Sequence, residues 1–158
     1  MRRRSLTSLI VVLAIGLSPS RVDAQASTSA RRDSIVTFVR SYVDAANRAD
    51  VHASMEMMSR SPSVSSVALG SITRGWESVR AQADSAAGSE GQFKVSLGSM
   101  DVTLLGTSAA LVVTAASIWV ETEDGPVQLR GALTLVVERV AGVWKVLHEH
   151  LSVPLPEG

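Results

Sequence analysis

Two histidines close to the C-terminal end are the residues whose type and spacing suit chemistry best. His148 and His150 lie two positions apart in a stretch with strand-like alternation, so both side chains are expected on one face. A neutral imidazole can act as a general base near neutral pH, or bond to a ligand's carbonyl or carboxylate. The plainer interpretation is that the pair lies in a cavity wall and ties the last strand to the first helix.

The same two histidines could begin a metal site, but a metal ion needs at least a third ligand. His52 belongs to another expected element, and Glu121 is only a potential neighbour. We therefore expect no metal and no cofactor. The chain also lacks a nucleophile elbow, and it has no phosphate-binding glycine-rich loop that leads into a helix with a lysine.

The histidines belong to the second half of an expected β-hairpin over residues 127–152. Ala141-Gly142 is the turn between two runs with period-two alternation. In the second run Trp144 and Val146 share a face with the histidines, whereas Glu149 is expected to point the other way. This face, apolar at its start and polar at its end, is expected to line a cavity.

The rest of the chain predicts helices first and long strands afterwards. Apolar residues at helical spacing indicate helices at residues 34–49, 51–58 and 75–87. Asp50 is expected to cap the second helix, and a short strand is expected at 64–69. From residue 93 the period changes to two, which predicts antiparallel strands. Helices segregated from a run of strands are typical of an α+β fold.

The strand expected over residues 108–121 is apolar on both faces. Leu111, Val113 and Trp119 fall on one face, and Val112 lies on the other. A strand buried on both sides needs cover on its outer face as well, and a second copy of the chain is a natural cover. We therefore expect a homodimer. The alternative is an exposed surface with some apolar content.

The first 24 residues predict an export signal. Arg2, Arg3 and Arg4 precede an apolar run over 9–17, and residues 22–24 form a small-residue cleavage site. The apolar run is shorter than the roughly 20 residues that span a bilayer, although an uncleaved anchor is the alternative. The mature protein is expected in the periplasm or outside the cell, with no membrane association.

After the signal, we expect a flexible lead-in over residues 25–33 and one domain over 34–153. The chain has no cysteine, so disulfides cannot support the fold. Its formal net charge is zero and its basic residues are scattered. Binding to a phosphate backbone requires a basic stripe, so nucleic acid is not expected as a partner.

Three stretches carry a resemblance when taken together. They are residues 42–50 (YVDAANRAD), 74–80 (RGWESVR) and 142–152 (GVWKVLHEHLS). They resemble, in order, the end of the first helix with the Asp that caps the second, the Gly-led third helix, and the closing strand of the SnoaL-like and ketosteroid-isomerase-like proteins of the nuclear transport factor 2 superfamily. The resemblance implies a cone-shaped, curved antiparallel sheet wrapped on a long N-terminal helix, with a hollow between them. It says little about function, because the superfamily holds enzymes, binding proteins and oligomerisation modules.

The resemblance also implies a role for Tyr42. In ketosteroid isomerases the matching tyrosine donates a hydrogen bond to the developing oxyanion, and a carboxylate base moves the proton. That base position falls at Ser65-Ser66, and no Asp or Glu lies between Glu56 and Glu77. The chain therefore lacks the isomerase base where the resemblance would place it. A core-lining aromatic is the plainer interpretation of Tyr42.

Six residues are the expected lining of the hollow: Tyr42, Met55, Trp76, Trp119, His148 and His150. The plainer interpretation of the two tryptophans is that they are core residues. The leading hypothesis is an exported domain that binds a small, largely apolar molecule, with no reaction assigned. One alternative is an enzyme of the isomerase, dehydratase or hydrolase type, with His148 or His150 as base and Tyr42 as donor. The other is a non-catalytic dimerisation module whose hollow is filled by side chains.

Overall fold

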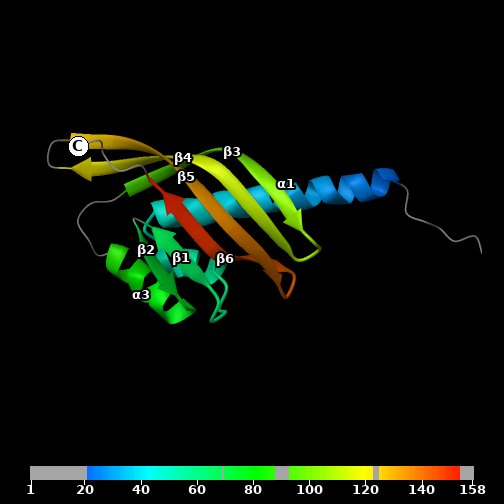
Figure 1. Ribbon diagram of the computed structural model, residues 1–158, viewed down its shortest axis with the longest axis horizontal. Coiled ribbons are helices and arrows are strands. Elements are labelled where there is room, and N and C mark those ends of the chain that lie inside the picture. Colours follow the sequence, from blue (N-terminus) through cyan, green and yellow to red (C-terminus); the bar gives the residue numbers. More distant parts are fainter. Residues whose placement is uncertain (1–20, 69, 88–92, 123–124, 154–158) are drawn as a thin grey trace, which may run out of the picture.

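The computed structural model describes residues 21–68, 70–87, 93–122 and 125–153. The helices of this part are α1 (Arg21–Asn47), α2 (Val51–Met57) and α3 (Trp76–Ala87). The strands are β1 (Ser65–Ala68), β2 (Ser71–Arg74), β3 (Phe93–Leu105), β4 (Ala109–Thr122), β5 (Gly125–Val140) and β6 (Val143–Ser152). Figure 1 shows how they are arranged. This succession of helices, a short strand pair, a helix and long strands confirms the predicted α+β class.

The strands form one curved sheet in the order β2-β1-β6-β5-β4-β3. Neighbouring strands of the described sheet are antiparallel, apart from β1 and β6, which run parallel. The expected hairpin between β5 and β6 is confirmed, with Ala141 and Gly142 both at positive φ in its turn. The β1–β6 pair joins the short N-terminal strands to the long C-terminal ones.

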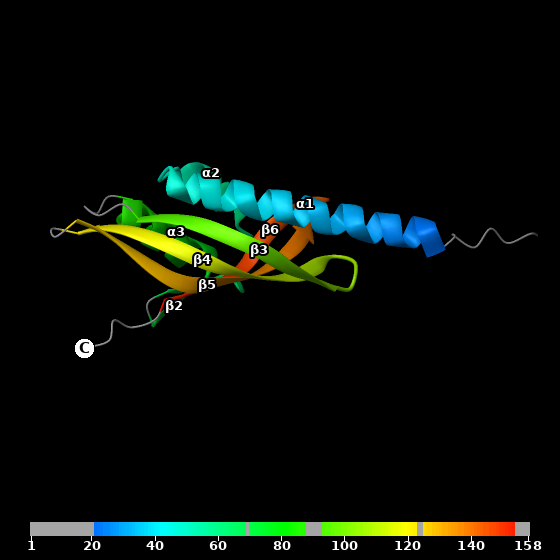
Figure 2. The same cartoon turned by 90° about the horizontal axis from the view of Figure 1, so that it is seen from above.

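Helix α1 lies along one face of the sheet (Figure 2). Ile35 and Val39 on this helix are fully buried, and so are Val112, Leu135 and Val146 on the strands beneath it. Removing such side chains from water is the main stabilising contribution to a fold without disulfides. The core therefore lies between α1 and the inner face of the sheet.

Helix α1 begins earlier than predicted. Residues 25–33 continue the helix from Arg21, where a flexible lead-in was expected. Most of these residues are exposed and polar, so they show no apolar stripe, yet alanine and arginine favour helix without tertiary contacts. Arg31 also donates a hydrogen bond of 3.3 Å to the carbonyl of Gly106 in the β3–β4 turn.

Most of the expected export signal lies outside the described residues, and export stays a prediction. Of the helices that the structure describes, none combines the length and apolar character needed to cross a membrane.

Helix α2 is capped as predicted. The Asp50 carboxylate accepts a hydrogen bond of 3.0 Å from the Ala53 amide. Met55 and Met58 from this helix and its end are buried. The cap fixes the residue at which α2 starts. The start sets which side of the helix carries Met55 and Met58 toward the core.

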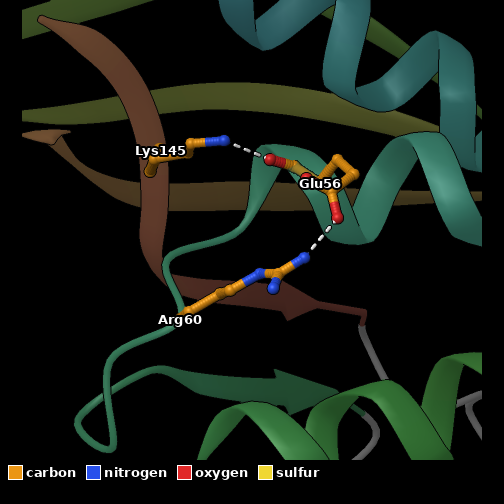
Figure 3. A network of polar contacts seen from close by, with 3 residues as sticks. All are labelled: Glu56, Arg60 and Lys145. Carbon is orange, nitrogen blue, oxygen red and sulfur yellow. Dashed lines mark hydrogen bonds and ion pairs between the residues drawn. The ribbon is translucent and has the colours of Figure 1, made fainter. Parts of the chain in front are cut away.

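The end of α2 is anchored on β6. The Ser59 amide donates to the Val146 carbonyl at 2.8 Å, which extends the sheet edge beyond β1. The Lys145 ammonium donates to the backbone carbonyl of Glu56, and the Glu56 carboxylate pairs with Arg60 at 2.5 Å (Figure 3). These contacts hold α2 in place as one wall of the space described next.

Candidate functional site

A cavity of about 370 Å³ lies between the three helices and the sheet. Its walls are mainly apolar and come from α1, α2, α3 and strands β1, β3, β5 and β6. Among the apolar lining residues are Val43, Met55, Met58, Val79, Leu133 and Leu151. A largely apolar hollow of this size falls in the range of sites for small molecules.

Among the described residues that line the cavity, one carries a carboxylate, Glu149 on β6. The Tyr42 hydroxyl from α1 donates to its Oε2 at 2.6 Å. The Ser66 hydroxyl from β1 donates to its Oε1 at 2.8 Å. Three elements that are distant in sequence therefore converge on one acidic group.

A β-bulge in β6 explains why Glu149 faces the cavity. Val137 pairs with Val146 and Val136 pairs with His148, so Leu147 has no partner on β5. An extra residue in one strand shifts the alternation of the side chains that follow by one position. The expectation that Glu149 points away from the cavity was therefore wrong.

The bulge also moves the two histidines to the outer face of the sheet. His148 is half-buried, and its Nδ1 lies 2.9 Å from the Ser65 hydroxyl. His150 is exposed and pairs with Val67 on β1 and Thr134 on β5. Neither histidine is among the residues that line the cavity. Their suggested role as bases stays a prediction, whereas the carboxylate found in the cavity wall belongs to Glu149.

Of the other residues named from the sequence for the hollow, Tyr42 and Met55 lie in the cavity wall, whereas the two tryptophans lie elsewhere. The guanidinium groups of Arg60 and Arg80 lie over the Trp76 ring, at 5.0 and 5.5 Å from its centroid. Trp76 lines a separate hollow of about 420 Å³ at the start of α3. Trp119 is 37 % exposed on the outer face of β4.

The environment of Tyr42 keeps its hydroxyl protonated. Burial raises the pKa of Tyr42 well above its ordinary value, and the negative charge of Glu149 and the hydrogen bond to that carboxylate raise it further. Each of these causes disfavours a phenolate. At neutral pH the residue is therefore a hydrogen-bond donor whose proton points at Glu149.

A family model for the SnoaL-like domain matches residues 35–156, which is most of the chain. The chain belongs to the SnoaL-like domain family. No curated protein matches it.

Several solved structures share the fold of this SnoaL-like domain, among them one of the nuclear transport factor 2 superfamily. A superfamily protein from Salmonella enterica has a TM-score of 0.69 and 20% sequence identity, and the match covers 83% of this chain and 96% of that one. A candidate scytalone dehydratase from Novosphingobium aromaticivorans has a TM-score of 0.73 and 11% identity, with coverage of 83% and 89%. A CaMKII hub from S. rosetta has a TM-score of 0.66 and 22% identity, with coverage of 77% and 95%. At these identities the likeness establishes the architecture only.

An asparagine holds the rim of the cavity in this SnoaL-like domain. The Asn47 amide nitrogen donates to the Val95 carbonyl at 2.8 Å, and its oxygen accepts from the Val95 amide at 2.8 Å. Both residues line the cavity. The side chain thus replaces a strand partner at the edge of β3 and ties the end of α1 to the sheet. Sequence reasoning missed this contact, because nothing in the local pattern marks it.

Within the described ranges, no three His, Cys, Asp or Glu side chains gather closely enough to hold a metal ion. Polar side chains in the described lining also include Asn47, Ser54 and Gln82, and Tyr42 and Ser66 are the two that bond to Glu149.

Proposed function

We propose that this SnoaL-like domain binds a small, largely apolar molecule in the cavity, with a polar group of that molecule at Glu149. The observation that carries the proposal is the pairing of an apolar hollow of about 370 Å³ with one carboxylate in its wall. Burial of the ligand's apolar surface would supply most of the affinity, at roughly 25 cal/mol per Å². The carboxylate would fix its orientation.

The cavity walls suit a ligand of variable shape. Met55 and Met58 lie in the lining, and methionine side chains adapt to irregular apolar surfaces. Helix α3 contributes Ala83, whose small side chain leaves room beside the sheet. We therefore expect several related apolar molecules to bind, with the polar group setting which of them binds best.

A filled cavity tests the proposal. Ala83→Phe adds a large side chain to the cavity wall without removing a polar group, and Ala81→Phe makes the same change at an exposed position of α3. A thermal-shift screen of apolar small molecules should give hits with the natural chain, because a ligand that binds the folded state raises its melting temperature. Ala81→Phe should keep those hits and Ala83→Phe should lose them. Hits that persist in a folded Ala83→Phe variant would place the binding elsewhere.

A second candidate function is proton transfer on the bound molecule. It is favoured by one observation, the presence of a carboxylate and a protonated phenol in contact within an apolar cavity. Glu149 would act as base and Tyr42 as donor, in place of the histidines considered from sequence. One of the similar structures is a candidate scytalone dehydratase, and dehydratases are among the enzyme types considered from the sequence. Glu149→Gln should then lower turnover by about 10²- to 10⁴-fold while neutral ligands still bind.

We also propose that two copies associate through the outer face of the sheet. Val113 and Trp119 are large apolar residues of β4 that are 39 % and 37 % exposed on that face. Exposed apolar surface of this kind is typical of sites where proteins associate. The CaMKII hub shares the fold, which supports association as a use of this architecture. A module that only associates would show no cavity-dependent binding in the screen above.

A further inference from the structure

The charged side chains among the described lining residues of the cavity are of one sign only, negative. Glu149 is the only carboxylate among the described lining residues, and none of those residues is Lys, Arg or His. The ion pairs of the described chain are Glu56–Arg60 and Arg80–Asp84, and neither involves Glu149. The two groups that do contact Glu149, the hydroxyls of Tyr42 and Ser66, are neutral.

An ionised carboxylate without a cation is costly in apolar surroundings. Removing its charge from water is compensated only when a partner of opposite charge or enough hydrogen bonds replace the water. A carboxylate offers about four acceptor sites, and the two hydroxyls occupy one on each oxygen. Acceptor sites therefore remain for a ligand that brings N–H donors and a positive charge.

We infer that the ligand is a protonated amine with an apolar body, whose ammonium group binds Glu149 while the body fills the cavity between α2, α3 and the sheet. This inference rests on the proposed binding function and names the class of ligand for that site. Hydrogen bonds between an ammonium and a carboxylate are charge-assisted and about twice as strong as neutral ones. An anionic ligand meets the charge of Glu149 without a compensating cation and is excluded by repulsion.

The hydroxyl donors fit this assignment. Tyr42 and Ser66 hold the two oxygens of Glu149 from α1 and β1, so the carboxylate is oriented before the ligand arrives. A preorganised acceptor costs less to use, because its side chain has already lost its rotational freedom. The raised pKa of Tyr42 keeps this donor neutral, and so the phenol adds no second negative charge beside the ammonium.

Binding of matched ligands to the full chain can show whether the charge of the head group or the shape of the apolar body determines affinity. Cyclohexylmethylamine, cyclohexylmethanol and cyclohexanecarboxylate share an apolar ring and differ in a cationic, neutral or anionic head group. The same three head groups on a phenylpropyl body give a second, longer series. Binding is measured by calorimetry and thermal shift near neutral pH, where the amines are protonated.

With the natural chain, the amine of at least one series should bind about tenfold more tightly than its alcohol, and the acid should bind most weakly. Glu149→Gln should reduce that preference to within about threefold, with alcohol binding retained. Glu121→Gln removes the same charge at an exposed position of β4 and should leave the preference intact. Ser66→Ala removes one hydrogen bond to Glu149 and keeps its carboxylate, so it should retain the preference for the amine. This variant therefore tests the role of the charge even where Glu149→Gln folds poorly.

The outcomes are distinct. If alcohols bind as well as amines to the natural chain, or if Glu149→Gln keeps the amine preference, the cationic class is wrong while binding in the cavity stands. If no member of either series binds, or if binding survives Ala83→Phe, the proposed function itself fails.

Discussion

The Tyr42 hydroxyl donates a hydrogen bond of 2.6 Å to Glu149, a residue 107 positions later in the chain. The contact joins the end of the long helix to the last strand. Ser66 reaches the same carboxylate because β1 runs parallel to β6, with Ser66 opposite Glu149 in the register. The polar centre of the cavity therefore depends on packing between α1, β1 and β6, and each of its bonds can be tested separately.

Tyr42 should titrate at a pH well above the ordinary tyrosine value of 10.0, because burial and the adjacent Glu149 both oppose its ionisation. It is the only tyrosine in the chain, so phenolate absorbance in the near ultraviolet reports this residue alone. The folded protein should show no phenolate signal at a pH where the unfolded chain in denaturant is already ionised. A folded-state titration near 10.0 would contradict the hydrogen bond to Glu149.

The same raised pKa makes the free energy of unfolding depend on pH in the alkaline range. Above pH 10.0 the unfolded chain loses the Tyr42 proton while the folded chain keeps it, so the unfolded state binds fewer protons. The contribution is therefore fully present below that pH and is lost as the pH rises toward the folded pKa. Denaturation curves of the natural chain and Tyr42→Phe, measured on both sides of pH 10, should differ in slope. The phenylalanine variant should lack the tyrosine part of the decline.

Glu149→Gln should lower the pKa of Tyr42 without returning it to 10.0. The variant removes the charge and the charged acceptor, which are two of the three causes of the shift, but burial is the largest cause and remains. The measurement is the phenolate titration in the variant. Ser66→Ala is the matched control, because it alters the other oxygen of Glu149 and keeps its charge. A pKa of Tyr42 unchanged in Glu149→Gln would mean that the two side chains are not coupled.

The fold was predictable from the sequence, but which residues face the cavity was only partly so. Period-two alternation located the C-terminal strands and their turn, and Asp50 marked the start of α2. Alternation also assigned Glu149 to the wrong face, because it assumes an unbroken strand and Leu147 forms a bulge. A bulge depends on how two strands pair, and no single residue type in the hairpin predicts it.

Contacts between distant segments were the other part that local patterns could not supply. The Asn47–Val95 pair and the parallel β1–β6 register depend on tertiary packing rather than on propensity. The helical stretch over 25–33 was missed for a related reason, since an exposed polar helix has no apolar periodicity to detect.

Trp119→Glu should weaken self-association through the outer face of the sheet. Trp119 is 37 % exposed, so the folded chain can accept the change, whereas an interface formed by this face would bury an unpaired carboxylate. Sedimentation should show a dimer for the natural chain and a shift toward monomer for the variant. Ala81→Glu places the same charge on an exposed residue of α3, away from the outer face of the sheet, and should sediment like the natural chain. A natural chain that is monomeric at high concentration would contradict the dimer.

Gly131→Ala should destabilise the fold by about 1–3 kcal/mol, the usual cost of forcing an extra methyl into a packed site. A Cβ at Gly131 would lie 2.2 Å from the Ser152 carbonyl oxygen and 3.2 Å from a methyl of Ile118, so β5 or the end of β6 must move. Gly98→Ala is the matched control in β3, since its Cβ would have only ordinary contacts, 3.5 Å or longer. Urea denaturation of both variants gives the comparison. Equal stability of the two would show that the β5–β6 backbone is not held this closely.

Asn47→Ala should cost about 1–3 kcal/mol, because it leaves the Val95 N–H and C=O without their side-chain partner at the rim of the cavity. Asn47→Asp should be no better, since a carboxylate can accept from the amide but cannot donate to the carbonyl. Asp44→Ala, at an exposed position of the same helix, should change the free energy of unfolding by no more than about 0.5 kcal/mol. Hydrogen exchange locates the effect. The Val95 amide should exchange faster in Asn47→Ala than in Asp44→Ala, and an unchanged rate would mean that α1 does not hold the edge of β3 through this side chain.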